Sequence, residues 1–126
     1  MNKRSSQSLH KRHSVELKFL ESVRNRLPRH THVLEALGNL YTRVGLYEDG
    51  LKIDQDLTRM RPEDAENWYN LGCSCALTGR TEEAFKALDQ AVTLGYCNVE
   101  WMLKDEDLKP LHKDPRFKAL IARMKN

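Results

Sequence analysis

Residues 65–91 read AENWYNLGCSCALTGRTEEAFKALDQA, and this stretch decides the fold. Its first half places residues at the i, i+3, i+4, i+7 spacing of one helical face, namely Trp68, Leu71, Gly72 and Cys75. Gly79 follows, as glycine commonly does at the end of a helix. A second helical run then has small and apolar residues on one face, namely Ala84, Leu88 and Ala91. The stretch therefore predicts two helices joined by a short turn, and a larger side chain at Gly72 is expected to force them apart.

The chain matches itself when it is shifted by 34 residues. Leu37-Gly38 then falls on Leu71-Gly72, Gly45 falls on Gly79, and Pro62 lies 34 residues after Pro28. A fixed period of this length is the signature of a helical repeat array. The same pair of helices is therefore expected in the residues that precede residue 65.

Length and composition agree with one small helical domain. The chain has 126 residues, of which 40% are hydrophobic and 31% are charged, so a thin core and a large polar surface are expected. Its apolar runs fall short of the roughly 20 residues that cross a membrane, and charged residues interrupt any signal-peptide core. The three cysteines have no disulfide spacing. These features favour a cytoplasmic protein without a membrane partner.

The period and the residues quoted above resemble the tetratricopeptide repeat (TPR) family. The stretch Trp68-Tyr69-Asn70-Leu71-Gly72 is close to the family pattern, and the first repeat has Leu34, Leu37-Gly38, Tyr41, Gly50 and Pro62 at the same places. The resemblance implies an all-α fold, a right-handed α-solenoid of antiparallel helix pairs with about six or seven helices. Three residues depart from the pattern, namely Cys75, Tyr96 and Asp54. Asp54 stands where a large apolar residue is usual, and a buried carboxylate needs partners. Its carboxylate either reaches solvent through a locally shifted helix or makes hydrogen bonds, and we expect the first.

The repeat register divides the chain. Residues 1–13 form a basic leader, expected to be disordered, and residues 14–126 form a single domain. The domain comprises an N-terminal half-repeat helix (14–28), repeat 1 (31–64), repeat 2 (65–98), and a partial repeat with a C-terminal cap (99–126). Asp114-Pro115-Arg116-Phe117 is a strong helix start, and it resembles the ending of short bacterial tetratricopeptide proteins. We expect this last helix to dock back on the helix of the partial repeat.

The motifs of common catalytic sites are absent from the sequence, and the protein is not expected to be an enzyme. Cys73 and Cys75 lie two positions apart in a helix and point in different directions, so they cannot share a metal ion. Cys97 could be reactive if it is exposed. Four histidines, His10, His13, His30 and His32, are expected to be solvated. Neither a cofactor nor a metal is predicted.

Protein binding is the function that the resemblance implies. In the family, the first helix of each repeat lines a concave groove, and residues that do not pack against other helices point into it. The predicted groove residues are His32, Glu35, Asn39, Arg43, Glu66, Tyr69, Asn70, Cys73, Glu100 and Lys104. Tyr69 offers a rigid contact surface, and the two asparagines can hydrogen-bond the backbone of an extended peptide.

The acidic C-terminus of a chaperone is not the expected ligand. Asn39, Asn70 and Lys104 match three positions of the family's carboxylate clamp, but Glu35 and Glu100 stand where lysine is expected. Two reversed charges would repel a ligand carboxylate. The protein is therefore expected to be a scaffold or adaptor for neutral or basic segments, as a monomer or a weak dimer. A helical face without a ligand is the alternative.

A nucleic-acid accessory protein that uses the basic leader is the second function considered. Residues 1–13 hold four Lys/Arg and no acid, so the rest of the chain carries a net charge of −1 out of the total of +3. A dedicated nucleic-acid binder usually has a more basic domain, and a solvated tail is the plainer interpretation. Nucleic acid is therefore not the expected partner.

Overall fold

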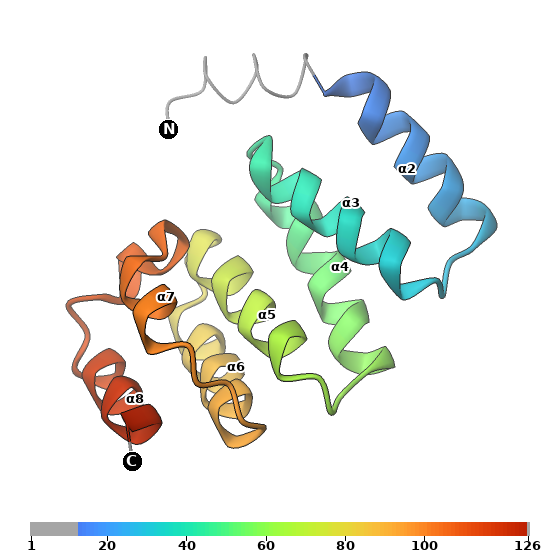
Figure 1. Cartoon of the computed structure of the whole chain (residues 1–126). Coiled ribbons are helices and arrows are strands. Elements are labelled where there is room, and N and C mark those ends of the chain that lie inside the picture. The colour runs from blue at the N-terminus through green and yellow to red at the C-terminus, as the bar shows by residue number, and fades with distance from the viewer. Residues whose placement is uncertain (1–12, 126) are drawn as a thin grey trace. The chain divides into compact units, whose positions relative to one another are not determined.

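The computed structural model describes residues 13–125, and within that range every regular element is a helix (Figure 1). Residues 13–125 form seven α-helices and one 3₁₀ helix, with bounds α2 Ser14–Arg26, α3 Thr31–Arg43, α4 Tyr47–Met60, α5 Ala65–Leu77, α6 Thr81–Thr93, α7 Val99–Lys104, η1 Glu106–Leu111 and α8 Pro115–Lys125. Within the units, α2 packs on α3, α3 pairs with α4, and α5 pairs with α6. The predicted all-α class and the pairing of helices are confirmed.

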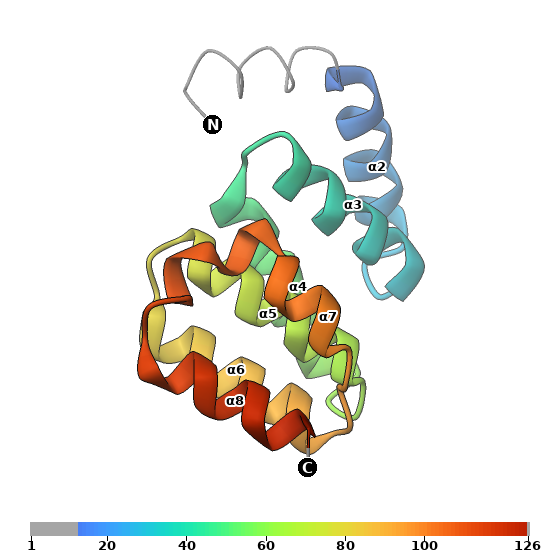
Figure 2. The ribbon, with the colours of Figure 1, turned by 60° about the vertical axis from the view of Figure 1, so that its left-hand side comes forward.

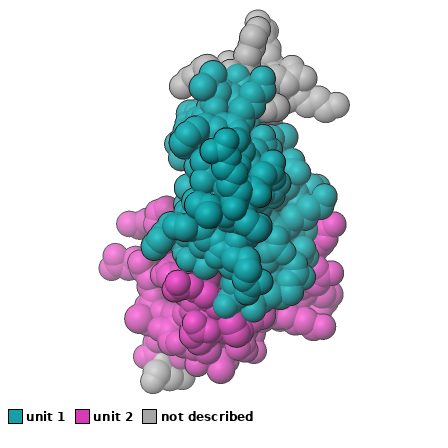
Figure 3. All heavy atoms as spheres, turned by 90° about the vertical axis from the view of Figure 1, so that its right-hand side faces the viewer, with its two compact units in different colours: residues 1–60 teal, residues 61–126 magenta. Residues whose placement is uncertain are grey.

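The chain divides into two compact units, residues 1–60 and residues 61–126, which Figure 3 colours separately. In the first unit α3 and α4 form a helical hairpin, and Gly45 in its turn has a φ of 87°. That left-handed backbone conformation favours glycine. Helix α2 packs on α3 and contributes Leu17 to the core. The main core residues are Leu17, Leu34, Leu37, Leu40, Tyr41, Val44, Ile53 and Leu57.

Asp54 lies inside this first unit, and the expectation that it reaches solvent is wrong. The residue is only 8% exposed. The cause is the close approach of α3 and α4 at Gly38, where an added Cβ would lie 3.4 Å from Asp54 Oδ1 and 3.1 Å from Ile53 Cγ2. The missing side chain at Gly38 makes room for the carboxylate, which therefore lies against α3 and not on the surface.

The second unit begins with the hairpin of α5 and α6. Gly79 in its turn has a φ of 76°. The two helices approach closely at Gly72, where an added Cβ would lie 2.7 Å from both Cγ and Cδ2 of Leu88. Because Leu88 is fully buried, this contact explains why the sequence has glycine at that place.

Helices in both units begin at 34-residue intervals. Thr31, Ala65 and Val99 start the first helix of each pair, and Tyr47, Thr81 and Pro115 start the second. Residues 99–125 therefore keep the spacing of a further pair, but its first helix is broken in two at Asp105. That residue has an extended backbone, with φ −66° and ψ 114°, and its side chain caps η1 by accepting a hydrogen bond from Asp107 N at 3.0 Å.

Helix α8 begins as the sequence indicates. The backbone N–H of Arg116 donates to Asp114 Oδ1 at 3.0 Å, which satisfies a donor of the first turn. Its buried stripe consists of Phe117, Leu120 and Ile121. We expected α8 to dock on the helix at residues 99–104. Helix α8 touches α7, but its principal neighbour is α6. Figure 2 shows α6 and α8 side by side.

Candidate functional site

The predicted groove residues of the first unit lie on the exposed face of α3. His32, Glu35, Asn39 and Arg43 follow one another at three- or four-residue steps, which places them along one stripe. The His32 side chain is 83% exposed, and its Nδ1 lies 3.6 Å from Glu35 Oε2. Asn39 and Arg43 are exposed as well. This polar stripe, which we call the α3 face, is available to a partner in the described structure.

In the second unit the predicted residues separate into two groups. Glu66, Glu100 and Lys104 are exposed, and Asn70 is half-buried. Tyr69 and Cys73 are instead 3% and 6% exposed, so the prediction that they face a binding partner is wrong. The Tyr69 ring stacks on Tyr96 with centroids 4.3 Å apart, and η1 packs over this side of α5. Sequence periodicity located the helical face, but it could not show that a later segment of the chain covers it.

Burial of Tyr69 and Cys73 creates a polar cluster beneath η1. The hydroxyl of Tyr69 donates to Asp105 Oδ2 at 2.6 Å, and the Cys73 thiol lies 3.6 Å from the same oxygen. Asp105 Oδ1 accepts from Asp107 N. Both oxygens of a buried carboxylate are thereby occupied, which is the condition for burying such a group at tolerable cost. The cluster fastens η1 to α5.

The pKa values of the cluster follow from its burial. Burial raises the pKa of the Tyr69 hydroxyl, with further contributions from Cys73 and the hydrogen bond to Asp105. Burial likewise raises the pKa of the Cys73 thiol well above its ordinary value, and the charge of Asp105 adds to this effect. The pKa of Asp107 rises to about 6 because it is partly buried and lies near Asp105 and Glu106. The hydroxyl and the thiol are therefore held in their protonated, donating forms.

This cluster also brings together three groups of the kind that bind metal ions. One ligand atom each of Cys73, Asp105 and Asp107 lies within 4.8 Å of the others. A metal-bound cysteine must be a thiolate, whereas the raised pKa favours the thiol that Asp105 accepts from. These side chains therefore fit a hydrogen-bonded cluster better than a metal centre. Sequence reasoning missed it because Cys73 lies more than 30 positions from both aspartates.

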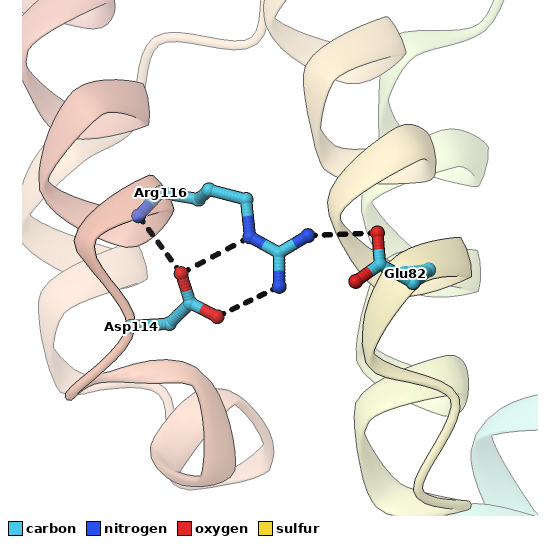
Figure 4. A network of polar contacts seen from close by, with 3 residues as sticks. All are labelled: Glu82, Asp114 and Arg116. Atoms are coloured by element: carbon cyan, nitrogen blue, oxygen red, sulfur yellow. Dashed lines mark hydrogen bonds and ion pairs between the residues drawn. The ribbon is translucent and has the colours of Figure 1, made fainter.

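A groove between α6 and α8 is the second feature that sequence reasoning missed. It encloses about 410 Å³, and Phe85, Ala119 and Leu120 contribute its apolar lining. Arg116 crosses from α8 to α6 at one end, as Figure 4 shows: its Nη1 donates to Glu82 Oε2 at 2.8 Å, and its Nε and Nη2 donate to Asp114 at 3.0 and 2.8 Å. The guanidinium also lies 4.4 Å from the centroid of the Phe85 ring. The hydrogen bonds that the side chain and the backbone N–H of Arg116 donate to Asp114 lower the pKa of Asp114 to about 2.

The other end of the groove has a matching bridge. Arg123 of α8 pairs with Asp89 of α6, and its Nη2 donates to Thr93 Oγ1 at 3.0 Å. Each ion pair joins residues 34 positions apart, Glu82 with Arg116 and Asp89 with Arg123. The repeat period was therefore the signal that could have located both bridges.

Among residues 13–125, none of the helices has the length and apolar character that crossing a membrane requires. Residues 1–12 of the basic leader lie outside the described residues, so the nucleic-acid alternative stays a prediction. No protein-family model and no curated protein matches the sequence. The tetratricopeptide resemblance accordingly depends on the residues and spacing described above.

Proposed function

We propose that this protein is a tetratricopeptide-like interaction module, a scaffold or adaptor that binds a peptide or protein segment on the exposed faces of its first helices. The observation that carries the proposal is the 34-residue recurrence of helical pairs from Thr31 to Lys125. A repeat array of this kind presents equivalent surfaces at regular intervals, which suits the recognition of extended segments. Because fold alone does not define function, the proposal is anchored on specific exposed side chains.

The α3 face supplies the contacts that the proposal assigns to the first unit. Asn39 can donate to and accept from a peptide backbone, and Arg43 offers several donors in a planar fork. Neither residue belongs to the core of the unit, so both side chains can contact a ligand without disturbing the helix. We therefore assign Asn39 and Arg43 the largest share of binding on this face.

The second unit contributes two exposed acids, Glu66 on α5 and Glu100 on α7. These acids, and separately Glu35 on the α3 face, each favour a neutral or basic segment over an acidic one. The acidic tail of a chaperone is accordingly not proposed as the ligand. Tyr69, predicted to offer a rigid contact surface, is buried, so the proposal assigns the contacts to the exposed polar residues.

A matched pair of double variants tests the proposal. Asn39→Ala with Arg43→Ala removes the two contacts, whereas Asn25→Ala with Arg26→Ala removes the same residue types from exposed positions of α2. Tagged full-length proteins are used to capture partners from the native cell, and the captured partner is then purified and its Kd measured. We expect about tenfold weaker binding or more for the α3 pair, the size of one or two interface hot spots.

The α2 pair is expected to bind like the unmodified protein, and both variants should keep the helical circular-dichroism signal. Equal partner affinity in the two double variants would exclude the α3 face as the binding site.

A further inference from the structure

The groove between α6 and α8 lies on the second helices of their pairs, away from the first-helix faces considered above. From its lining we infer that it is a separate docking site for a peptide in which a large apolar residue stands next to an acidic one. The inference goes beyond the proposed function, since it needs none of the residues assigned to the first-helix faces. It depends on three properties of the groove: its bounds, its apolar lining and the distribution of its charges.

The two ion-pair bridges set the length of the groove. Glu82 and Asp89 lie seven residues apart on α6, as do Arg116 and Arg123 on α8. At 1.5 Å per residue, the open length between the bridges is about 10 Å, or two helical turns. This length accommodates one large side chain and its neighbour, and it excludes a whole helix lying along the groove.

The floor of the groove is apolar. Phe85 and Leu120 are nearly buried, with 7% and 5% exposure, and Ala119 is exposed beside them. The small side chain of Ala119 leaves the space that the groove encloses. Because the stems of the long basic residues along the rim are also hydrocarbon, an incoming leucine or phenylalanine would contact carbon atoms on the floor and at the rim.

The charges of the lining indicate which kind of residue should stand next to the apolar side chain of the ligand. Glu82 and Asp89 are each paired with an arginine of α8. Lys86 stands between them on the same face of α6, lines the groove and takes part in neither bridge. An acid on the ligand would therefore meet Lys86, a lining charge that neither bridge neutralises. The lining complements a carboxylate that adjoins the apolar side chain.

Nuclear magnetic resonance titration of the full chain tests this inference with two synthetic probes. The probes are acetyl-Gly-Phe-Glu-Gly-amide and the uncharged acetyl-Gly-Phe-Gln-Gly-amide. We expect saturable shifts of the backbone amides around Lys86 and Ala119, with tighter binding of the glutamate probe. The preference should be about two- to fivefold, the range given by an exposed ion pair.

Two variants and two controls locate the binding. Lys86→Gln should remove the preference for the glutamate probe, whereas Lys52→Gln, at the equivalent exposed place of α4 one period earlier, should keep it. Ala119→Leu fills the groove and should abolish binding of both probes, whereas Ala122→Leu, exposed on the same helix but outside the lining, should leave it intact.

The inference is overturned if neither probe gives saturable shifts in α6 and α8, if Ala119→Leu binds as tightly as Ala122→Leu, or if the two probes bind equally. Shifts confined to α3 would also overturn it, and they would instead support the first-helix faces. Because this readout is independent of the Asn39 and Arg43 double variant, the two proposals can fail separately.

Discussion

The contact between Gly72 and Leu88 leads to a quantitative prediction about stability. In Gly72→Ala the new Cβ would start 2.7 Å from two carbons of Leu88, so the atoms must separate by about 0.7 Å to reach ordinary contact. Leu88 is 0% exposed, so its side chain cannot relieve the contact by moving out into solvent. Overpacking of this kind costs about 1–3 kcal/mol, while alanine in place of glycine inside a helix contributes about 1 kcal/mol in the other direction. The expected net loss is therefore up to about 2 kcal/mol.

A double-mutant cycle isolates the cause of that loss. In the Leu88→Ala background the clash is absent, so Gly72→Ala should raise stability by about 1 kcal/mol through helix propensity alone. The sign of the effect is therefore expected to reverse, with a coupling free energy of about 1–3 kcal/mol. Urea unfolding followed by circular dichroism gives the free energy of unfolding of all four proteins. Because Leu88→Ala itself costs about 2–5 kcal/mol, all four are measured in the same concentration of a stabilising osmolyte.

Gly38→Ala in the first unit serves as a comparison. Its added Cβ would lie 3.1 Å from Ile53 Cγ2, a milder contact, so a smaller loss is expected. The reasoning is refuted if Gly72→Ala changes the free energy of unfolding by the same amount, in the same direction, with and without the Leu88 side chain.

Two further predictions concern the buried cluster beneath η1. Tyr69→Phe removes the hydroxyl that donates to Asp105 and should lower the free energy of unfolding by about 1–3 kcal/mol. The control Tyr47→Phe, at a half-buried tyrosine, should change the free energy of unfolding by less than about 0.5 kcal/mol. Equal effects of the two variants in urea unfolding would contradict a stabilising hydrogen bond from Tyr69 to Asp105. Because the pKa of Asp107 is raised from 3.8 to about 6, the folded state binds more protons than the unfolded state between these values, and this group should lower stability as pH rises through that window. Asp107→Asn should therefore be more stable than the unmodified protein above pH 6 and should lose that part of the pH dependence. If the free energies of unfolding of the two proteins change in parallel with pH, Asp107 does not titrate as inferred.

Helical periodicity and the positions of the glycines predicted most of the fold. The spacing of Trp68, Leu71, Gly72 and Cys75 predicted α5, and Gly45 and Gly79 have the left-handed backbone expected at helix ends. These features are local, because they depend on contacts within one or two turns of the chain. Local patterns therefore predicted which residues are helical and which consecutive helices pair as hairpins.

Burial across elements was harder to predict. Tyr69 occupies a helical face that a sequence pattern identifies as polar and available, yet η1 and Tyr96 cover it. The covering segment arises where the first helix of the last pair breaks at Asp105, a position that corresponds to Leu71 one period earlier. An aspartate at a position of the repeat that is otherwise apolar occurs twice, at Asp54 and Asp105, and both are buried. In each case a polar residue in an apolar register marked a tertiary contact and not a surface.

The tie between Tyr69 and Asp105 also bears on the order in which the chain can fold as it is synthesised. The two residues are 36 positions apart, and the bridges from α6 to α8 span 34. A nascent chain that has emerged only as far as the α5 and α6 hairpin lacks the carboxylate that Tyr69 requires and both arginines that bind α6. In the first unit, by contrast, the bond from Tyr41 to Glu21 reaches back only 20 residues. The first unit can thus mature early on the ribosome, while the second must wait until its last helix has been made.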